Sequence, residues 1–400
     1  MLPDDWKLVR LGDIAQISSG GTPDRSQARY WNGDIPWVTT GEVQFNTITD
    51  TAEKITAKGL KNSSAKLFPP GTLLMAMYGQ GKTRGQVAKL AIEATTNQAC
   101  AAILLSDGCD LDYVYQYLAS QYEAIRELGN TGAQQNLNVE LIKRIALPLP
   151  SMREQQRIAT LARAWDDAIA TAEKLLANSQ LHAHTMSQAL LCGQRRLEGS
   201  TEWSRRTLAE MLSESRIPGS SGNVAQKLTV KLYGKGVIAK NERRQGSEAT
   251  TYFRRRAGQF IYSKLDFLNG AFGLIPPRLD GYESTLDLPA FDVLDGVDGH
   301  WLLYYVSRKA FYQAHLGLAN GGRKARRVNP QDLLQVSIDY PPLAEQQAIA
   351  EAIGTLRDDE RKWDTMCALL RVEKQAVMAD LLTGKRRVRI SEDTAAPEPA

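Results

Sequence analysis

Cysteine is scarce in this 400-residue chain, and long hydrophobic runs are missing. The four cysteines form no Cys-x-x-Cys pair and have no metal-ligand spacing to the four histidines. This argues against a disulfide-stapled secreted protein and against a zinc module. No run approaches the ~20 apolar residues needed to cross a bilayer, and the first ten residues lack the apolar core of a signal peptide. We therefore expect a cytoplasmic chain with reduced thiols, no bound metal and no membrane partner.

Catalytic motifs are also lacking. The chain has no His-Glu-x-x-His, Gly-x-Ser-x-Gly or Gly-x-Gly-x-x-Gly pattern, and no Asp/Asn-Pro-Pro-Tyr/Phe run of the kind that adenine methyltransferases carry. Residues 76–83 (AMYGQGKT) fit a loose P-loop with alanine in place of the first glycine. Gly85 weakens the helix that should begin there. A P-loop NTPase using Lys82 stays open as an alternative function.

The basic charge of the chain is concentrated in one segment. Lys and Arg total 49 against 45 Asp and Glu, a net +4. Residues 201–340 alone carry 20 − 14 = +6, so the remaining segments together are slightly acidic. This excess indicates a polyanionic partner for that third of the chain.

The chain contains one internal repeat of long period. Residues 154–158 read EQQRI and residues 345–349 read EQQAI, an offset of 191. At this offset, 12 of the 44 positions from 154–197 and 345–388 are identical without a gap. Trp6 and Trp203 stand near the start of each half. The repeat predicts two half-length units, each a variable globular part followed by a similar tail.

Each tail is predicted to be a long amphipathic helix. Apolar residues step by three and four, Ser151 with Glu154 resembles a capping box, and Gly193 and Gly384 are natural helix stops. About 38 residues at ~1.5 Å each give roughly 57 Å. Two independent helices, each packed on its own domain, are the alternative; the narrow seam favours an antiparallel coiled coil. The predicted seam comprises Ile158, Leu161, Trp165, Leu175, Ile349, Leu356, Trp363 and Met366.

The globular parts read as α+β folds. Short β-like runs at 14–17, 37–39, 72–77, 101–105, 227–232, 259–262 and 272–275 alternate with Gly/Pro/Asn turns, and helices fit 111–128 and 299–314. We divide the chain into a first globular domain at 1–150, a helix at 151–200, a second domain at 201–340, a helix at 341–388 and a disordered tail at 389–400.

Several runs in the sequence resemble one family. They are residues 17–23 (ISSGGTP), 30–37 (YWNGDIPW), 77–79 (MYG) and 95–99 (TTNQA), and in the second half 233–236 (YGKG), 262–265 (YSKL), 270–273 (GAFG) and 280–285 (DGYEST). They are similar to target recognition domains of type I restriction–modification specificity subunits. The LPLP and YPP runs feeding the Glu-Gln-Gln helices resemble that family's spacers. The resemblance covers about residues 1–388.

The resemblance implies a non-catalytic, sequence-specific DNA-binding subunit. It implies two α/β target recognition domains that each read half of a split double-stranded DNA target, joined by paired helices that act as a ruler. It also implies two modification subunits, which bind S-adenosylmethionine and methylate adenine, and ATP-driven restriction subunits. This chain would hold no cofactor itself. A coiled-coil scaffold that joins two protein-binding domains without DNA binding is a second alternative.

Two loops at matching positions are candidate DNA contacts. Residues 317–327 (GLANGGRKARR) carry four cations suited to phosphate or guanine, and residues 129–136 (GNTGAQQN) carry amides that suit adenine. Ordinary polar surface loops are the alternative in both cases. Arg254, Arg255 and Arg256 are either DNA contacts or solvated charges at a strand end. The complete predicted DNA-facing set is Gly20, Gly21, Thr22, Tyr78, Gln80, Lys82, Arg84, Gln134, Gln135, Asn136, Tyr233, Lys235, Arg243, Arg244, Lys264, Arg323, Lys324, Arg326 and Arg327.

Overall fold

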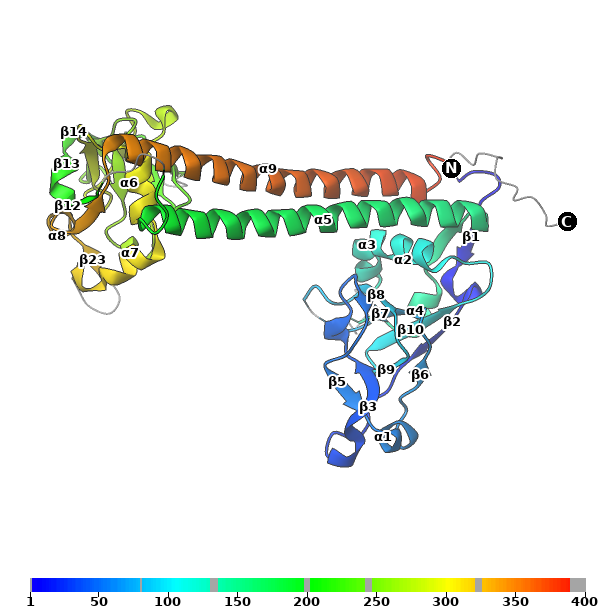
Figure 1. Ribbon diagram of the computed structural model, residues 1–400. Coiled ribbons are helices and arrows are strands. Elements are labelled where there is room, and N and C mark those ends of the chain that lie inside the picture. Colours follow the sequence, from blue (N-terminus) through cyan, green and yellow to red (C-terminus); the bar gives the residue numbers. More distant parts are fainter. Residues whose placement is uncertain are drawn as a thin grey trace. The chain divides into compact units, whose positions relative to one another are not determined.

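The computed structural model describes residues 2–79, 81–129, 136–197, 202–241, 247–320 and 326–388. The chain divides into two compact units, Met1–Glu173 with Thr365–Ala400, and Lys174–Asp364. Each unit contains one domain of mixed helices and sheets together with part of each long helix, α5 (Met152–Leu191) and α9 (Leu343–Leu382) (Figure 1). The α+β class and the two long helices confirm the predicted fold. Our division of the chain at residues 150, 200 and 340 stays a proposal, and the predicted disordered tail lies outside the described residues.

Two sheets form the core of the first unit, in the orders β2-β10-β7-β8-β4 and β5-β3-β9-β6, and β1 pairs with β11. All four residues of the central strand β7 are buried, as its continuous apolar run predicts. The strands are β1 Lys7–Arg10, β2 Ala15–Ser19, β3 Trp31–Val38, β4 Thr47–Ile48, β5 Glu53–Ile55, β6 Leu67–Phe68, β7 Leu73–Ala76, β8 Val87–Leu90, β9 Ala94–Thr96, β10 Cys100–Leu105 and β11 Ala146–Leu149.

Short helical segments lie between the strands of the first unit in the sequence. They are η1 Leu11–Asp13, η2 Ala28–Tyr30, η3 Thr40–Glu42, α1 Ala57–Lys61, α2 Leu111–Ser120, α3 Tyr122–Leu128 and α4 Val139–Lys143. The single helix predicted over 111–128 is therefore two helices that meet at Gln121. Within this unit α2 and α3 lie beside α5, whereas α1, β3 and β5 lie at the opposite end (Figure 1).

The second unit has a smaller four-stranded sheet, in the order β13-β21-β18-β19, and a three-stranded sheet, β14-β17-β20. Its core contains five aromatic rings that pack in stacked and edge-to-face pairs: Phe260, Tyr262, Phe267, Phe272 and Phe291. The strands are β12 Ser204–Thr207, β13 Leu212–Ser215, β14 Ile217–Ser221, β15 Leu228–Val230, β16 Val237–Ala239, β17 Thr251–Arg254, β18 Phe260–Tyr262, β19 Phe272–Leu274, β20 Glu283–Ser284, β21 Ala290–Val293, β22 Ala319–Asn320, β23 Arg327–Val328 and β24 Ser337–Tyr340.

The predicted helix over 299–314 is also divided, here at Ser307 and Arg308. The helices of this unit are η4 Leu208–Glu210, η5 Phe267–Asn269, η6 Pro277–Leu279, α6 Gly299–Val306, α7 Lys309–Ala314, η7 Leu316–Leu318 and α8 Pro330–Leu334. The remaining strands form the pairs β15-β16, β12-β24 and β22-β23.

The two long helices pack against each other in antiparallel directions within each unit. In the first unit Asp166 and Glu173 of α5 pair with Lys374 and Arg371 of α9, each at 2.5 Å, so residue numbers rise along one helix as they fall along the other. In the second unit the last residues of α5, Leu190 and Leu191, share a hydrophobic cluster with Ile349 near the start of α9. Buried and half-buried positions alternate in steps of four and three, the coiled-coil pattern. They are 158, 162, 165, 169, 172, 176, 179, 183, 186 and 190 in α5, and 349, 353, 356, 360, 363, 367, 370, 374, 377 and 381 in α9.

The predicted seam is wrong by one position at three places. Leu161, Leu175 and Met366 are 39%, 38% and 45% exposed, whereas the neighbouring Ala162 and Cys367 are buried. A three–four alternation fits two phases one residue apart, and large apolar side chains favour the phase that the sequence predicts. The structure buries the other phase, in which Ala162 and Cys367 take the places of Leu161 and Met366, and the half-buried Leu176 takes the place of Leu175. The other predicted positions are in the seam: Ile158 and Ile349 are buried, and Trp165, Leu356 and Trp363 are half-buried.

Candidate nucleic-acid interface

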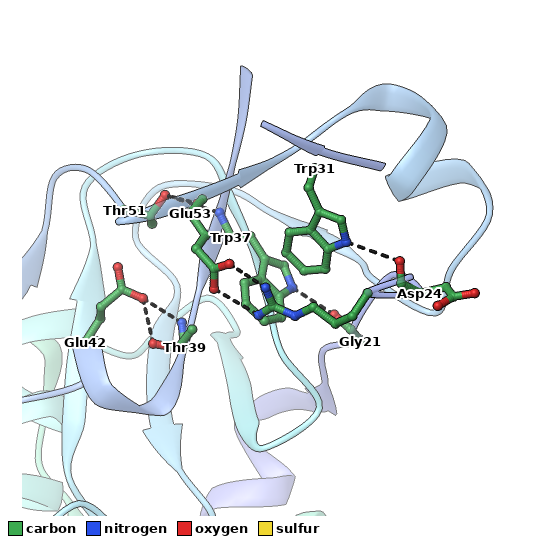
Figure 2. Close-up of polar contacts among 9 residues, drawn as sticks. Gly21, Asp24, Trp31, Trp37, Thr39, Glu42, Thr51 and Glu53 are labelled. Atoms are coloured by element: carbon green, nitrogen blue, oxygen red, sulfur yellow. Dashed lines mark hydrogen bonds and ion pairs between the residues drawn. The ribbon is translucent and has the colours of Figure 1, made fainter. Parts of the chain in front are cut away.

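The Gly-Gly-Thr loop of the first domain is an internal packing element. A Cβ atom on Gly20 would lie 2.1 Å from the carbonyl oxygen of Thr96, and one on Gly21 would lie 2.3 Å from the backbone of Ser64. Both glycines are buried, and the Gly21 carbonyl accepts a 2.9 Å hydrogen bond from Trp37 Nε1 (Figure 2). Their burial corrects our expectation that Gly20 and Gly21 face DNA, because close backbone approach explains why glycine is needed there. Thr22 is half-buried, and its hydroxyl donates to Gln98.

Beside this loop is a cluster that sequence reasoning missed. The Arg25 guanidinium lies 3.9 Å from the ring centroid of Trp31 and makes a two-point ion pair with Glu53, with Nη2 2.9 Å from Oε2. Trp31 and Trp37 meet edge to face at 5.0 Å. The hydrogen bond from Arg25 lowers the pKa of Glu53 below its ordinary value. The cluster therefore fixes loop 20–30 onto β3 and β5. The ion pair with Glu53 neutralises the charge of Arg25 within the domain.

The segment with the P-loop pattern is a β-hairpin loop. Antiparallel β7 and β8 flank it, so a strand follows Lys82 where a P-loop requires a helix. Two α3 side chains hold the loop: Arg126 Nη2 donates to the Gly81 carbonyl at 2.9 Å, and the Tyr122 hydroxyl donates to the Lys82 carbonyl. The described backbone of this loop, residues 76–79 and 81–83, offers no phosphate cradle of the P-loop kind.

The side chains of this hairpin have different environments. Tyr78 is 45% exposed and Lys82 is exposed, so both can reach a ligand, whereas Arg84 is only 7% exposed. Arg84 is therefore a structural residue and a correction to the predicted contact set. Gln80 lies outside the described residues.

The hairpin lies beside the second predicted contact segment of the first domain. The Leu137 amide donates to the Met77 carbonyl at 3.0 Å, which brings exposed Asn136 next to the strand end that carries Tyr78. A Cβ atom on Gly129 would lie 3.4 Å from Arg84 Nη1, so the other end of this segment also adjoins the hairpin. Gln134 and Gln135 lie outside the described residues.

The second domain repeats this arrangement. The Val328 amide donates to the Lys264 carbonyl at 3.1 Å, and Val328 is the residue 191 positions after Leu137. The bond places exposed Arg326 and Arg327 next to half-buried Lys264. Arg327 also pairs with Asp287, with Nε 3.4 Å from Oδ1. Arg243, Arg244, Arg323 and Lys324 lie outside the described residues.

A further predicted loop of the second domain projects into solvent. Tyr233 is 68% exposed and has a left-handed φ of 58°, an uncommon conformation for a non-glycine residue that is often kept at functional sites. Its amide donates to the Asn269 carbonyl at 2.9 Å, and the Gly234 amide donates to the Gly270 carbonyl at 2.9 Å. These two bonds hold exposed Lys235 on a fixed backbone.

Arg255 is the clearest internal member of the arginine triplet. It is 1% exposed, and its guanidinium donates to the Ser215 carbonyl at 2.7 Å and to the Ser284 hydroxyl at 2.8 Å. Burial lowers the pKa of Arg255 to about 10. It ties together three β-segments and is not a DNA contact, whereas its neighbours Arg254 and Arg256 are exposed.

The repeated Glu-Gln-Gln runs close the base of each domain. Glu154 does not complete the predicted capping box: its amide approaches Ser151 Oγ at 3.4 Å, but its carboxylate accepts from Trp6 Nε1 at 3.0 Å and from Arg387. Glu345 accepts in the same way from Trp203 Nε1 at 3.0 Å and from Arg196.

The first glutamine of each run has its own repeated role. Gln155 bonds the Asp110 amide and the Pro150 carbonyl, at 2.8 and 3.0 Å. Gln346 bonds the Asp298 amide and the Pro341 carbonyl, each at 2.8 Å. Each long helix therefore begins with a glutamine whose hydrogen bonds also fix the start of a second helix, α2 in the first unit and α6 in the second.

Comparison with known proteins shows which sequences and structures this chain resembles. Residues 3–178 match the family model of the type I restriction modification DNA specificity domain. The type I restriction enzyme MjaIX specificity subunit of Methanocaldococcus jannaschii is 31% identical over 178 residues, which cover 43% of this chain and 40% of that protein. The EcoR124I/EcoR124II specificity subunit of Escherichia coli is 26% identical over 40% of this chain and 41% of that protein. The first 178 residues of this chain are thus similar to the specificity domain of type I restriction–modification systems.

Family similarity extends into the second half at lower identity. These two matches span about two fifths of the length of each relative. A putative MjaX specificity subunit of M. jannaschii is 23% identical over 97% of this chain and 95% of that protein. The S subunit structure from M. genitalium has a TM-score of 0.57 and 13% identity over 96% of this chain and 98% of that one. The HsdS structure from Thermoanaerobacter tengcongensis has a TM-score of 0.56 and 17% identity over the same fractions. These structures share the fold of the chain.

Among the described residues, no group of three or more His, Cys, Asp or Glu side chains is arranged to hold a metal ion. None of the helices in the described ranges has both the length and the apolarity that a membrane crossing requires.

Proposed function

We propose that this chain is the sequence-reading subunit of a type I restriction–modification complex and binds a two-part target in double-stranded DNA. The observation that carries the proposal is the repeated hydrogen bond that joins the candidate contact segments, Leu137 to Met77 in one domain and Val328 to Lys264 in the other. Each domain therefore presents two adjacent segments with side chains suited to nucleic acid: exposed Tyr78 and Asn136 in the first, and half-buried Lys264 with exposed Arg326 in the second. Amides suit base edges and cations suit phosphates or guanine.

The proposed partners are two modification subunits and the restriction subunits. S-adenosylmethionine and ATP would bind to those partners, and this chain would catalyse no step and act in the cytoplasm, where its DNA is. The family relatives are named specificity subunits, and one solved structure with this fold concerns the complex assembly of a type I system. Exposed apolar side chains on the long helices offer docking points for the modification subunits: Leu161 and Leu175 on α5, and Met366, Leu369 and Val372 on α9.

We infer that the long helices set the unread gap of the target. Both are continuous over 40 residues, and the coiled-coil pattern runs along their length. A heptad rises about 10 Å, which corresponds to about three base pairs of duplex. Deleting residues 169–175 together with 364–370 would remove one heptad from each helix at facing positions. The gap should then shorten by about three base pairs while both half-sequences are kept.

The test is selection of bound duplexes from a random pool, using the full chain co-purified with its partner subunits. A two-part motif with a fixed gap is the expected result. No enrichment from a folded, monodisperse sample would overturn the proposal and favour the scaffold alternative. ATP binding that is lost in Lys82→Ala would instead revive the NTPase alternative, against the hairpin geometry.

A further inference from the structure

A strongly basic groove of about 680 Å³ lies within the second unit, between the second domain and the two long helices. Its walls are the loop at Tyr233, the junction of α6 and α7, and adjoining faces of α5 and α9. One acidic side chain, Glu360, and five basic ones line it, so its formal charge is 5 − 1 = +4. The basic side chains are Lys235, Arg308, Lys309, Arg357 and Arg361.

The cations of this groove are held in place while most of their charge stays available. The Arg357 guanidinium lies 4.4 Å from the Tyr304 ring centroid and that of Arg308 lies 3.9 Å from Tyr305, contacts that orient a guanidinium without neutralising it. Lys235 and Lys309 are exposed, and neither makes an ion pair with another described residue. Arg361 pairs with Asp358 on its own helix.

A polar group in the wall lacks a partner. The Ser307 hydroxyl is buried, and no described residue hydrogen-bonds it. A buried hydroxyl without a partner is costly, and an acceptor bound in the groove would satisfy it. Gly234 lies against this side chain: a Cβ atom there would be 4.0 Å from Ser307 Oγ. The groove therefore adjoins the Tyr233 loop, already a candidate DNA contact.

The equivalent groove of the first unit has the opposite balance. It measures about 820 Å³ and is lined by Leu382 and Met378, which lie 191 positions after Leu191 and Ser187 of the basic groove. Two basic and three acidic side chains line it, 2 − 3 = −1, and ion pairs with Asp166 and Glu173 neutralise both cations. Arg357 stands where the repeat of the first unit has Asp166. The same architectural position is basic in one unit only.

We propose that the basic groove of the second unit binds backbone phosphates of the duplex next to the half-site read by the second domain. The inference rests on the proposed function and extends it by making the helices α5 and α9 part of the DNA-binding surface. Clustered Arg and Lys side chains, a buried hydroxyl without a partner in the wall and adjoining tyrosines fit a phosphate chain better than a base edge. The first unit would make no matching contact, so the footprint of the protein would be asymmetric.

The test compares the salt dependence of DNA binding for charge-matched variants of the full chain in complex with its partner subunits. Lys309→Gln with Arg357→Gln removes two groove cations. The control, Lys362→Gln with Arg371→Gln, also removes two cations from α9. Lys362 lies outside both grooves, and Arg371 lines the groove of the first unit. Each phosphate contact contributes about 0.9 to the slope of log K against log salt, so the groove variant should lose about 1.8 and the control little. From 50 to 200 mM salt the wild type should then weaken about 12-fold more than the groove variant.

A second readout needs no substitution. Cys192 is exposed and its Sγ lies 2.8 Å from Arg308 Nη1, at the edge of the groove. Bound duplex should slow the alkylation of Cys192 at least several-fold, as measured by mass spectrometry. Inorganic phosphate, added at the same concentration of phosphate groups, should leave the alkylation rate unchanged. Protection by phosphate alone would overturn the DNA assignment in favour of a free-anion site.

The remaining outcomes separate this inference from the proposed function. Equal slopes in the two double variants, with sequence-specific binding intact, would overturn the groove proposal alone. Loss of a co-purified subunit with an unchanged slope would also overturn it and identify a protein-docking surface. If the wild type binds duplex without sequence preference and the groove slope still falls, the groove proposal stands and the reader function fails.

Discussion

Arg387 Nε lies 2.7 Å from Glu154 Oε1, which joins the end of α9 to the start of α5 across 233 positions of sequence. Arg387 Nη1 and Nη2 donate to the two carboxylate oxygens of Asp5, each at 2.8 Å. Trp6 Nε1 also donates to Glu154. The hydrogen bonds to Glu154 and Asp5 raise the pKa of Arg387, and the hydrogen bond from Arg387 lowers the pKa of Asp5. The ends of the first unit are therefore closed by one charged cluster.

Replacing Arg387 with glutamine should destabilise the first unit by roughly 2 kcal/mol. The Glu154 side chain is only 1% exposed, so it would keep a buried charge without its main partner, and the partial exposure of Arg387 reduces the full cost of such a loss. Urea unfolding measures the effect. Arg386→Gln is the control, because that side chain is exposed and no contact of it with a carboxylate is seen in the described residues. Equal stability of the two variants would contradict the role of the cluster.

The phase of the coiled coil can be tested with one pair of substitutions. Ala172→Leu inserts bulk into a buried seam position and should cost about 1–3 kcal/mol. Leu175→Ala removes an exposed side chain and should stay within about 0.5 kcal/mol. Thermal unfolding of both variants decides the phase. The reverse order of stabilities would restore the seam that the sequence alone predicts.

The Arg25–Glu53 pair should make stability depend on pH in the acid range. The folded-state pKa of Glu53 is lowered, so its contribution is complete above its unfolded value, about 4.3, and is lost as the pH falls through the folded value. Glu53→Gln should therefore lower the unfolding midpoint by about 2 °C at pH 7 and by less as the pH approaches 3. Fluorescence of Trp31 and Trp37 provides the local signal. The control is Asp34→Asn, which changes an exposed residue of the neighbouring strand β3. A difference in unfolding midpoint between wild type and Glu53→Gln that does not change with pH would refute the pairing.

The two neighbouring arginines of the second domain should differ in their contribution to DNA binding. Arg327 already pairs with Asp287, whereas Arg326 is exposed and makes no ion pair within the described residues. Arg326→Ala should reduce the salt slope of binding to the selected duplex by about 0.9, one phosphate contact, and Arg327→Ala should reduce it less. An unchanged slope for Arg326→Ala would place this segment away from the DNA.

Local and periodic features could be predicted from the sequence because they depend on neighbours in the chain. The 191-residue repeat predicts two similar halves, the three–four alternation predicts the long helices, and Gly193 and Gly384 end them with φ of 69° and 72°. The β-like runs correspond to real strands. The helices predicted over 111–128 and 299–314 exist but are broken, because each has a local turn that its apolar pattern does not register.

Only the tertiary structure decided which polar residues serve the fold and which face solvent. Arg254, Arg255 and Arg256 look alike in sequence, yet only Arg255 meets three acceptors from distant segments. Glu154 fits a local capping box, but its carboxylate accepts hydrogen bonds from Trp6 and Arg387, which are distant in the sequence. The seam phase was undecided for the same reason: two heptad readings one residue apart are locally equivalent, and only the facing helix selects between them. Sequence by itself determined the repeat and the long helices. Long-range contacts, which no spacing encodes, decided which of the candidate side chains are buried in the fold and which stay exposed.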